Sequence, residues 1–344
     1  MLYLNSKAPN IAFKKNYRYS ADQYIADLEN VEKKRVEGGI YAKAFGSPTA
    51  SLAGTSVMAI GEGICLGIMK SKNAQMMSQK LKNSLILSLL GFIALGAAIW
   101  VSLQKWQNEL IENNDNTKVS DLLVKYGSDT SAKMSDKNLR KAGLGAQYNA
   151  INGVIEVNKN FIYDPLTQRM LEKFIKHEIQ HARQFEMIAG LDDGIEKLNF
   201  AIMYNTASRF KNHRLVVEQI KNIAEELNND KTGLYDGVTV PLSGAQVDLK
   251  KYIKGLEILI NNPNAKPEDI PMIIDVEHYK EAIAKRGPLS EEEKVKAEEY
   301  YQAWLNYPSM TGLNLINPFS GYRSNILEKE ARKAGRSKTG KIEY

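Results

Sequence analysis

Hydrophobic positions are most concentrated in two long stretches in the first third of the chain. Residues 84–103 carry no charged side chain, and about twenty apolar residues are enough to cross roughly 30 Å of hydrocarbon as a helix. Residues 51–69 are also apolar but include Glu62 and four glycines. The pattern predicts a membrane region at 51–103, with a transmembrane helix at 84–103 and either a second span, a re-entrant segment or a surface segment at 51–69. Both stretches could instead be core helices of a soluble domain.

The polar segments around this region predict the rest of the organisation. Residues 1–50 form a tail with one amphipathic helix at 20–36, where Ser20 is the cap and apolar residues recur at helical spacing. Residues 104–118 are expected to be a polar linker. Residues 119–344 are expected to form one folded domain, because no internal repeat divides them.

The first part of that domain predicts a hairpin followed by a long helix. The Asn152-Gly153 pair lies between two short runs with alternating apolar residues at 146–158, which is the strongest local signal for a tight β-hairpin. Asp164, followed by a proline, then begins a helix that continues to Gly190. The downstream pattern predicts helices at about 195–227, 246–259, 290–305 and from near 324, and a loop at 232–246 with room for a short strand. The expected fold is therefore α+β and predominantly α.

Composition and charge narrow the class of protein. An apolar fraction of 43% and a charged fraction of 25% are those of an ordinary folded chain. The net charge is +6, with basic and acidic residues interspersed, and no nucleic-acid motif is visible, so no nucleic-acid partner is expected. The single cysteine, Cys65, excludes an intrachain disulfide and a cysteine-rich zinc site.

Charges beside the apolar stretches predict an orientation in the bilayer. The segment 70–83 contains four lysines and no acidic residue, whereas the segment 104–116 is acidic on balance. The positive-inside rule therefore places the lysine segment in the cytoplasm and everything after residue 103 outside it, with one span or with a hairpin of two. The first fifty residues are polar and show no cleavable signal peptide. The lipid bilayer is thus an expected partner.

A chemical motif lies in the middle of the long helix. His177, Glu178 and His181 form H-E-x-x-H and include half of the four histidines in the chain. Residues four apart share a helical face, so both imidazoles can reach one ion. Zn²⁺ suits such nitrogen ligands, needs a third protein ligand and leaves one position for water. Glu178 can accept the proton of that water as a general base. The alternative is a pair of ordinary helix histidines.

With the hairpin upstream, this half of the domain resembles the zincin metallopeptidases. The resemblance implies a zinc-dependent hydrolase for a peptide or protein substrate, which would add as a strand along a sheet edge. Residues 150–158 are then the candidate cleft wall, with an ordinary structural hairpin as the alternative. The third histidine that metzincins carry is absent, because Gln184 and Met187 occupy the corresponding positions, and nothing near Phe200 fits the thermolysin-like pattern.

The third ligand is expected far downstream. The segment 322–335 resembles the glutamate-bearing helix of gluzincin-type families, and this resemblance implies Glu328 as the ligand, with Glu330 as second choice. Glu330 lies roughly 200° round the helix from Glu328 and should point elsewhere. Arg332 stands where such families often have aspartate, and with Glu328 it could equally form a surface i,i+4 pair. The remaining candidates have the pattern of ordinary helix or loop residues: His213, Glu218, Glu277 and His278.

These residues favour a membrane-anchored zinc metallopeptidase. Tyr322, Arg323 and Tyr148 are candidates for the group that stabilises the tetrahedral intermediate, with Tyr322 preferred. A second hypothesis is a membrane scaffold or binding protein whose peptidase-like fold does not cleave. The presence of Glu178 favours the enzyme. A third is a soluble helical protein with a chance motif. Other divalent metals also suit imidazole and carboxylate ligands.

Overall fold

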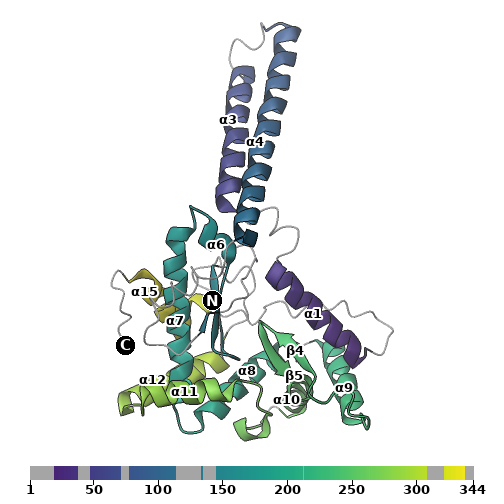
Figure 1. The fold of residues 1–344 in the computed structure, drawn as a ribbon, viewed down its shortest axis with the longest axis vertical. Helices are drawn as coiled ribbons and strands as arrows, with labels where there is room; N and C mark the ends of the chain where they lie inside the picture. The colour runs from purple at the N-terminus through teal and green to yellow at the C-terminus, as the bar shows by residue number, and fades with distance from the viewer. Residues whose placement is uncertain are drawn as a thin grey trace.

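The computed structural model of the 344-residue chain describes residues 19–37, 47–70, 77–113, 133–134, 145–211, 213–262, 264–307 and 321–337. It is mostly helical with a small sheet, in agreement with the expected class. A helical hairpin projects from a compact body that holds the remaining helices and strands (Figure 1). Of the predicted linker, residues 114–118 lie outside the described ranges.

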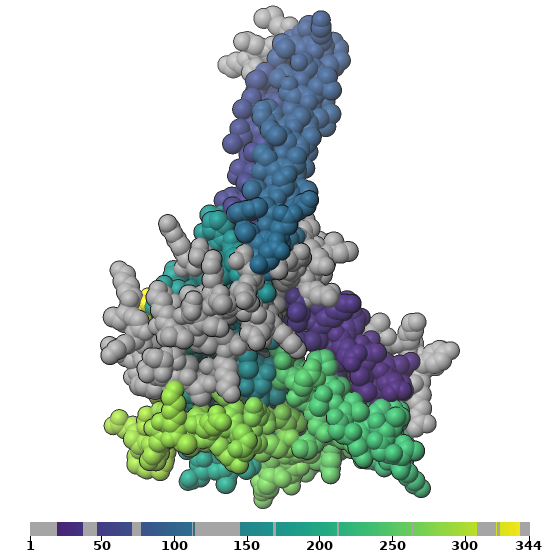
Figure 2. All heavy atoms as spheres, in the orientation of Figure 1, coloured from purple at the N-terminus to yellow at the C-terminus, as the bar shows by residue number. Residues whose placement is uncertain are grey.

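The projecting hairpin consists of α3 (Pro48–Lys70) and α4 (Gln79–Asn113). Their backbones approach closely where both helices have glycine: a Cβ on Gly54 would lie 2.7 Å from the carbonyl oxygen of Gly96, and one on Gly96 would lie 2.6 Å from that of Gly54. Both helices are long and apolar enough to cross a membrane, judged by length and composition. Most of the exposed large hydrophobic side chains lie on these two helices. Figure 2 shows how far the hairpin stands out from the body.

The helix that carries the histidine motif, α7 (Gln168–Ala189), crosses the middle of the body (Figure 1). Leu171, Ile175 and Ile179 repeat every four residues and are fully buried, so one face of the helix enters the core. The predicted start at Asp164 is wrong, because residues 164–167 form a turn after the short helix α6 (Lys159–Tyr163). The Asp164 carboxylate caps this turn by accepting from the Leu166 and Thr167 N–H groups. It also accepts hydrogen bonds from Ser47 and Thr49 at the start of α3.

The predicted β-hairpin is present, as β2 (Ala146–Asn149) and β3 (Val154–Val157) pair in antiparallel register. The connection has four residues and ends at Gly153, whose positive φ of 66° suits glycine. The third strand, β1 (Lys133–Met134), pairs in parallel with β3, which gives the order β1-β3-β2. The candidate cleft wall at 150–158 is therefore misplaced, since β3 is paired on both sides. Among the described strands, the edge next to α7 belongs to β2.

The predicted N-terminal helix is α1 (Ala21–Glu37), and it is packed rather than free. The Ala21 backbone N–H donates to Glu226 over 3.1 Å. Arg35 forms a buried ion pair with Glu156 of β3. The described part of the predicted tail is therefore packed into the body. It contacts segments that follow the membrane region in the sequence, although it precedes that region itself. Residues 104–113, predicted as linker, continue α4, and Gln107 donates to the Asn160 carbonyl over 3.0 Å.

The rest of the body surrounds α7 with helices and a second hairpin. In place of the predicted helix at 195–227 there are two helices, one ending at Phe210 and one beginning at Arg214, and a helix at 276–286 was not predicted. Where a loop with a short strand was expected at 232–246, a two-stranded sheet occupies residues 239–248, and the following helix begins at Leu249. The remaining elements are α8 (Gly194–Phe210), α9 (Arg214–Asn228), β4 (Thr239–Leu242), β5 (Ala245–Asp248), α10 (Leu249–Asn261), η2 (Pro267–Asp269), α11 (Val276–Arg286), α12 (Glu291–Leu305), α14 (Gly321–Ser324) and α15 (Ile326–Arg336).

Candidate metal centre

Three side chains from two helices converge on one point. His177 and His181 come from α7 and Glu328 comes from α15. The two imidazole Nε2 atoms are 3.2 Å apart, and they lie 3.6 Å (His177) and 3.5 Å (His181) from carboxylate oxygens of Glu328. Ligands held tetrahedrally at the usual zinc distances of roughly 2.0–2.1 Å are separated by about 3.3–3.4 Å. The three groups therefore fit one ion of that size.

Helix packing brings the glutamate to the histidines. Asn325 caps α15 by accepting from the Leu327 N–H, so Glu328 lies in the first turn. Ala331 was expected to let α15 approach α7 closely, and it is fully buried. A Cβ on Gly335 would lie 2.7 Å from the Lys173 carbonyl oxygen, which shows how close the two helices are. At the other end of α15, the Lys176 ammonium donates to the Ser337 carbonyl over 3.1 Å.

Burial and charge set the protonation states of the three groups. Burial lowers the pKa of His177 well below its ordinary value, and His181 beside it lowers it further. Burial also lowers the pKa of His181, against the opposing effect of Glu328. Burial alone would raise the pKa of Glu328, but the adjacent imidazoles of His181 and His177 hold it below its ordinary value. Neutral imidazoles with an ionised carboxylate are the states that bind a divalent cation.

Gln184 fixes the tautomer of His181. Its side-chain nitrogen donates to the Leu327 carbonyl over 3.1 Å. That carbonyl can only accept, so the amide oxygen of Gln184 must face the other way, where it lies 2.9 Å from Nδ1 of His181. Nδ1 therefore carries the proton, and in the neutral imidazole Nε2 keeps its lone pair for the candidate ion. Gln184, which stands where metzincins have a different residue, thus orients His181 by a hydrogen bond.

Glu178 occupies a different position from the two histidines. Its side chain is buried, and one carboxylate oxygen accepts a hydrogen bond of 2.8 Å from the Tyr148 backbone N–H. Tyr148 is on β2, and its N–H points away from β3 toward α7. This contact joins the motif helix directly to the edge strand.

The structure separates the two glutamates that the sequence left open. Glu330 points away from the histidines, as expected, and contacts the Tyr300 hydroxyl and Lys296. The four weaker candidates do not join the metal cluster, which contains only His177, His181 and Glu328 among the described residues. The alternative i,i+4 pair of Glu328 with Arg332 is present at 3.9 Å, but Glu328 is buried and is not part of a surface pair.

Of the three residues predicted to stabilise a tetrahedral intermediate, only Tyr148 has a described side chain. The Tyr148 hydroxyl lies 3.2 Å from the Tyr279 hydroxyl in the core, and its ring stacks on Phe185, so it does not face the ligands. Tyr322 and Arg323 belong to α14, and their side chains lie outside the described structure, so their roles stay predictions.

Tyr307 was not predicted as a site residue. It follows α12, and its hydroxyl donates to Glu328 over 2.6 Å in a buried position. Its ring packs against Trp304, with 4.8 Å between the ring centres. No local pattern connects Tyr307 with the H-E-x-x-H motif, because the contact arises only when α12 and α15 pack against α7.

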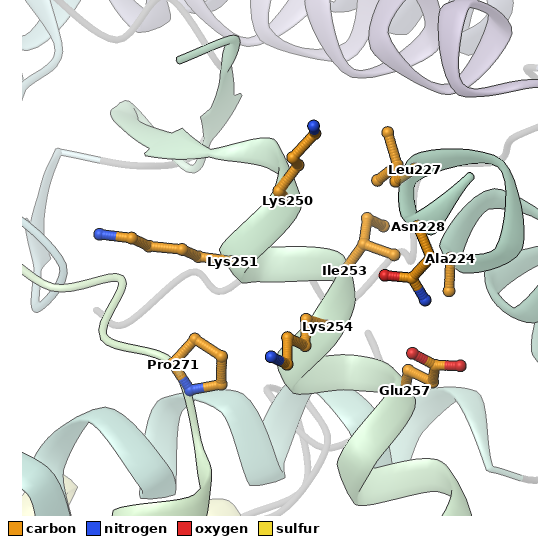
Figure 3. Close-up of a pocket in the computed structure, with 9 residues that line it drawn as sticks. All are labelled: Ala224, Leu227, Asn228, Lys250, Lys251, Ile253, Lys254, Glu257 and Pro271. Carbon is orange, nitrogen blue, oxygen red and sulfur yellow. The ribbon is translucent and has the colours of Figure 1, made fainter. Parts of the chain in front are cut away.

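A separate cavity of about 300 Å³ lies between α9 and α10 (Figure 3). Lys250, Lys251 and Lys254 border it, but their ammonium groups point in different directions, and Lys250 is paired with Asp230 and Asp236. None of the three metal-site residues lines it. The cavity therefore does not belong to the candidate metal centre.

The chain matches no protein-family model, no curated protein and no solved structure.

Proposed function

We propose that the protein is a membrane-anchored, zinc-dependent metallopeptidase of the zincin type. The observation that carries the proposal is the cluster of His177, His181 and Glu328, which has the donor types and spacing for one zinc ion. Glu178 follows His177 directly and is held against the edge strand β2. A chance motif has no reason to be completed by a buried carboxylate from a helix about 150 residues downstream.

The residues divide the chemistry between them. His177, His181 and Glu328 would hold the ion, and zinc there would supply Lewis acidity that lowers the pKa of a coordinated water. Glu178 takes up a proton of the attacking water at its carboxylate and later delivers it to the leaving amine. The Tyr148 N–H fixes that carboxylate. The buried surroundings keep bulk water away and strengthen these interactions.

The edge strand β2 is the proposed wall of the substrate cleft. The backbone N–H and C=O groups of Gln147 and Asn149 point toward β3. The backbone N–H and C=O groups of Ala146 and Tyr148 therefore point to the outer edge, beside α7. The Tyr148 N–H is already taken by Glu178 and β2 is buried, so a peptide that adds as a strand there must displace what covers this edge and pair through the remaining backbone groups of Ala146 and Tyr148. The substrate class is therefore a polypeptide segment in extended conformation.

The proposed orientation places the body outside the cytoplasm. The lysine-rich segment 70–83 would lie in the cytoplasm at the tip of the α3–α4 hairpin. Both ends of the hairpin then lie on the opposite side. The contacts of α1 with the body support a hairpin of two spans, because α1 precedes the hairpin and the rest of the body follows it.

Metal content of the full chain in detergent tests the site. We expect about one zinc per chain, lost or strongly weakened in Glu328→Gln and retained in the matched control Glu330→Gln, whose carboxylate points elsewhere. A folded chain that stays empty after zinc is added would refute the proposal. Zinc binding without hydrolysis of a broad peptide mixture would instead favour the membrane scaffold, in which the same site is structural.

A further inference from the structure

The turn between α6 and α7 lies against the base of the hairpin. The Asp164 carboxylate accepts hydrogen bonds from the Ser47 hydroxyl over 2.7 Å and from the Thr49 backbone N–H over 3.0 Å. The Ser47 N–H in turn donates to Gln104 of α4 over 3.0 Å. Asp164 is therefore anchored at the point where both hairpin helices meet the body (Figure 1).

This turn exposes large apolar side chains. Leu166 and Met170 are 47% and 46% exposed and lie four positions apart, and Pro165 beside them is exposed as well. The described part of the body has other exposed apolar residues, such as Leu234 and Val295, but they lie in separate elements. Single exposed hydrophobic residues need no explanation, whereas adjacent ones that continue a larger apolar surface indicate a contact. Figure 2 shows the teal part of the chain exposed directly beside the hairpin base.

The level of the turn matches the edge of the apolar stretches. The apolar run of α3 begins at Ser51, just after Ser47 and Thr49, which bind Asp164. That of α4 ends at Leu103, just before Gln104, which binds Ser47. Trp106 lies one turn further toward the body and is exposed, which suits a side chain in the interfacial layer of a bilayer.

We propose that the turn at 164–167 and the first turn of α7 form a second membrane contact, in which Leu166 and Met170 enter the interfacial layer of the bilayer that surrounds the hairpin. The inference rests on the proposed membrane hairpin. The occupant is lipid, because Asp164 fixes the turn to Ser47 and Thr49, just before the apolar run of α3 begins. The exposed apolar side chains of α3 and α4 follow from there.

The contact would set the height of the metal centre. His177 follows Met170 by seven positions on α7, which corresponds to about 10 Å along the helix axis. The centre is thus held close to the bilayer surface. Its substrates would be polypeptide segments that lie near the membrane, such as the flanks of membrane-spanning helices.

Depth measurements with spin labels test the contact. In a Cys65→Ala chain without other cysteines, single cysteines replace Leu166, Met170, Leu90 in α4 and the matched control Leu234, and each is labelled in phosphatidylcholine–phosphatidylglycerol nanodiscs. We expect labels at 166 and 170 to collide with oxygen and to be shielded from a water-soluble nickel chelate. The label at 90 should lie deeper, and the label at 234 should be fully accessible to the chelate.

The outcomes separate the contact from the anchor. A label at 166 as accessible to the chelate as that at 234, with the label at 90 buried in lipid, would overturn the proposed contact and leave the anchor intact. An accessible label at 90 would remove the anchor itself. Shielding at 166 with spin–spin broadening would mean that a second copy of the chain covers the turn, and would also overturn the lipid contact.

Discussion

The Gln184 side chain lies between His181 and the Leu327 carbonyl and hydrogen-bonds to both. It therefore links the orientation of one candidate ligand to the backbone that precedes another, Glu328. A single amide sets the imidazole tautomer and ties α15 to α7.

Replacing Gln184 by leucine should weaken zinc binding by roughly 10- to 100-fold, as loss of such hydrogen-bond partners usually does. Zinc affinity is measured by competition with a chromophoric chelator, and the His181 tautomer by nitrogen NMR of the imidazole. The control is Gln180→Leu, the same change one turn earlier on α7, which should leave both unchanged. Equal affinities in the two variants would show that Gln184 has no role in positioning His181.

Replacing Glu178 by glutamine should abolish peptide hydrolysis and preserve zinc binding. The amide oxygen can still accept from the Tyr148 N–H, but an amide cannot take up a proton, so a loss of roughly 10²- to 10⁴-fold in rate is expected. Zinc content and hydrolysis of a peptide library are measured on the same preparation. Glu196→Gln, on the surface of α8, is the control. Undiminished hydrolysis in Glu178→Gln would exclude the carboxylate as the general base.

Replacing Gly335 by alanine should destabilise the body and weaken zinc binding. Alanine favours a helix over glycine by up to about 1 kcal/mol, but here the new methyl group would meet the Lys173 carbonyl at 2.7 Å. Because a backbone group cannot move aside cheaply, α15 must shift and carry Glu328 away from the histidines. Thermal unfolding and chelator competition test this. Gly91→Ala in α4, where nothing lies within 4 Å of the added carbon, should be tolerated.

The metal-free protein should lose stability as the pH falls below about 6.5. The two histidines have pKa values lowered by burial from an ordinary value of 6.5. Below that pH the unfolded chain binds protons that the folded chain does not, so the free energy of unfolding decreases toward their folded pKa values. Glu328 adds a further loss only at lower pH, because its pKa is also lowered.

Thermal unfolding of the metal-free chain at pH 8, 7, 6 and 5 measures this effect. A chain with His177→Gln and His181→Gln should show a smaller decrease between pH 7 and 5. An identical decrease in both chains would assign the acid sensitivity to other groups.

Local sequence signals were enough for the core of the site. The spacing of His177 and His181 placed them on one helical face, and the angle between Glu328 and Glu330 separated these two candidates. These are properties of a single helix, so no tertiary information was needed. The apolar runs likewise located α3 and α4, because length and composition define such helices.

Contacts between distant segments produced the errors. Asp164 has the sequence pattern of a helix cap and accepts from the Leu166 and Thr167 N–H groups, but it caps only a short turn. Its other partners, Ser47 and Thr49, lie more than 100 residues away in the sequence. Residues 150–158 resemble an edge, but β1 covers β3. Tyr307 reaches Glu328 only through the packing of three helices. Such contacts depend on the whole fold, so they cannot be predicted from a short window of sequence.

The packing of α1 against the body has a consequence for how the protein is made. Segments on both sides of the hairpin build one body, and Arg35 and Glu156 must meet although the hairpin separates them in sequence. The ribosome releases α1 first, so this helix can pack against the body only after the segments beyond the hairpin have been made. In the proposed membrane arrangement the hairpin would insert during that interval, and the body would complete its fold afterwards. Insertion of the hairpin and assembly of the metal centre would then be coupled.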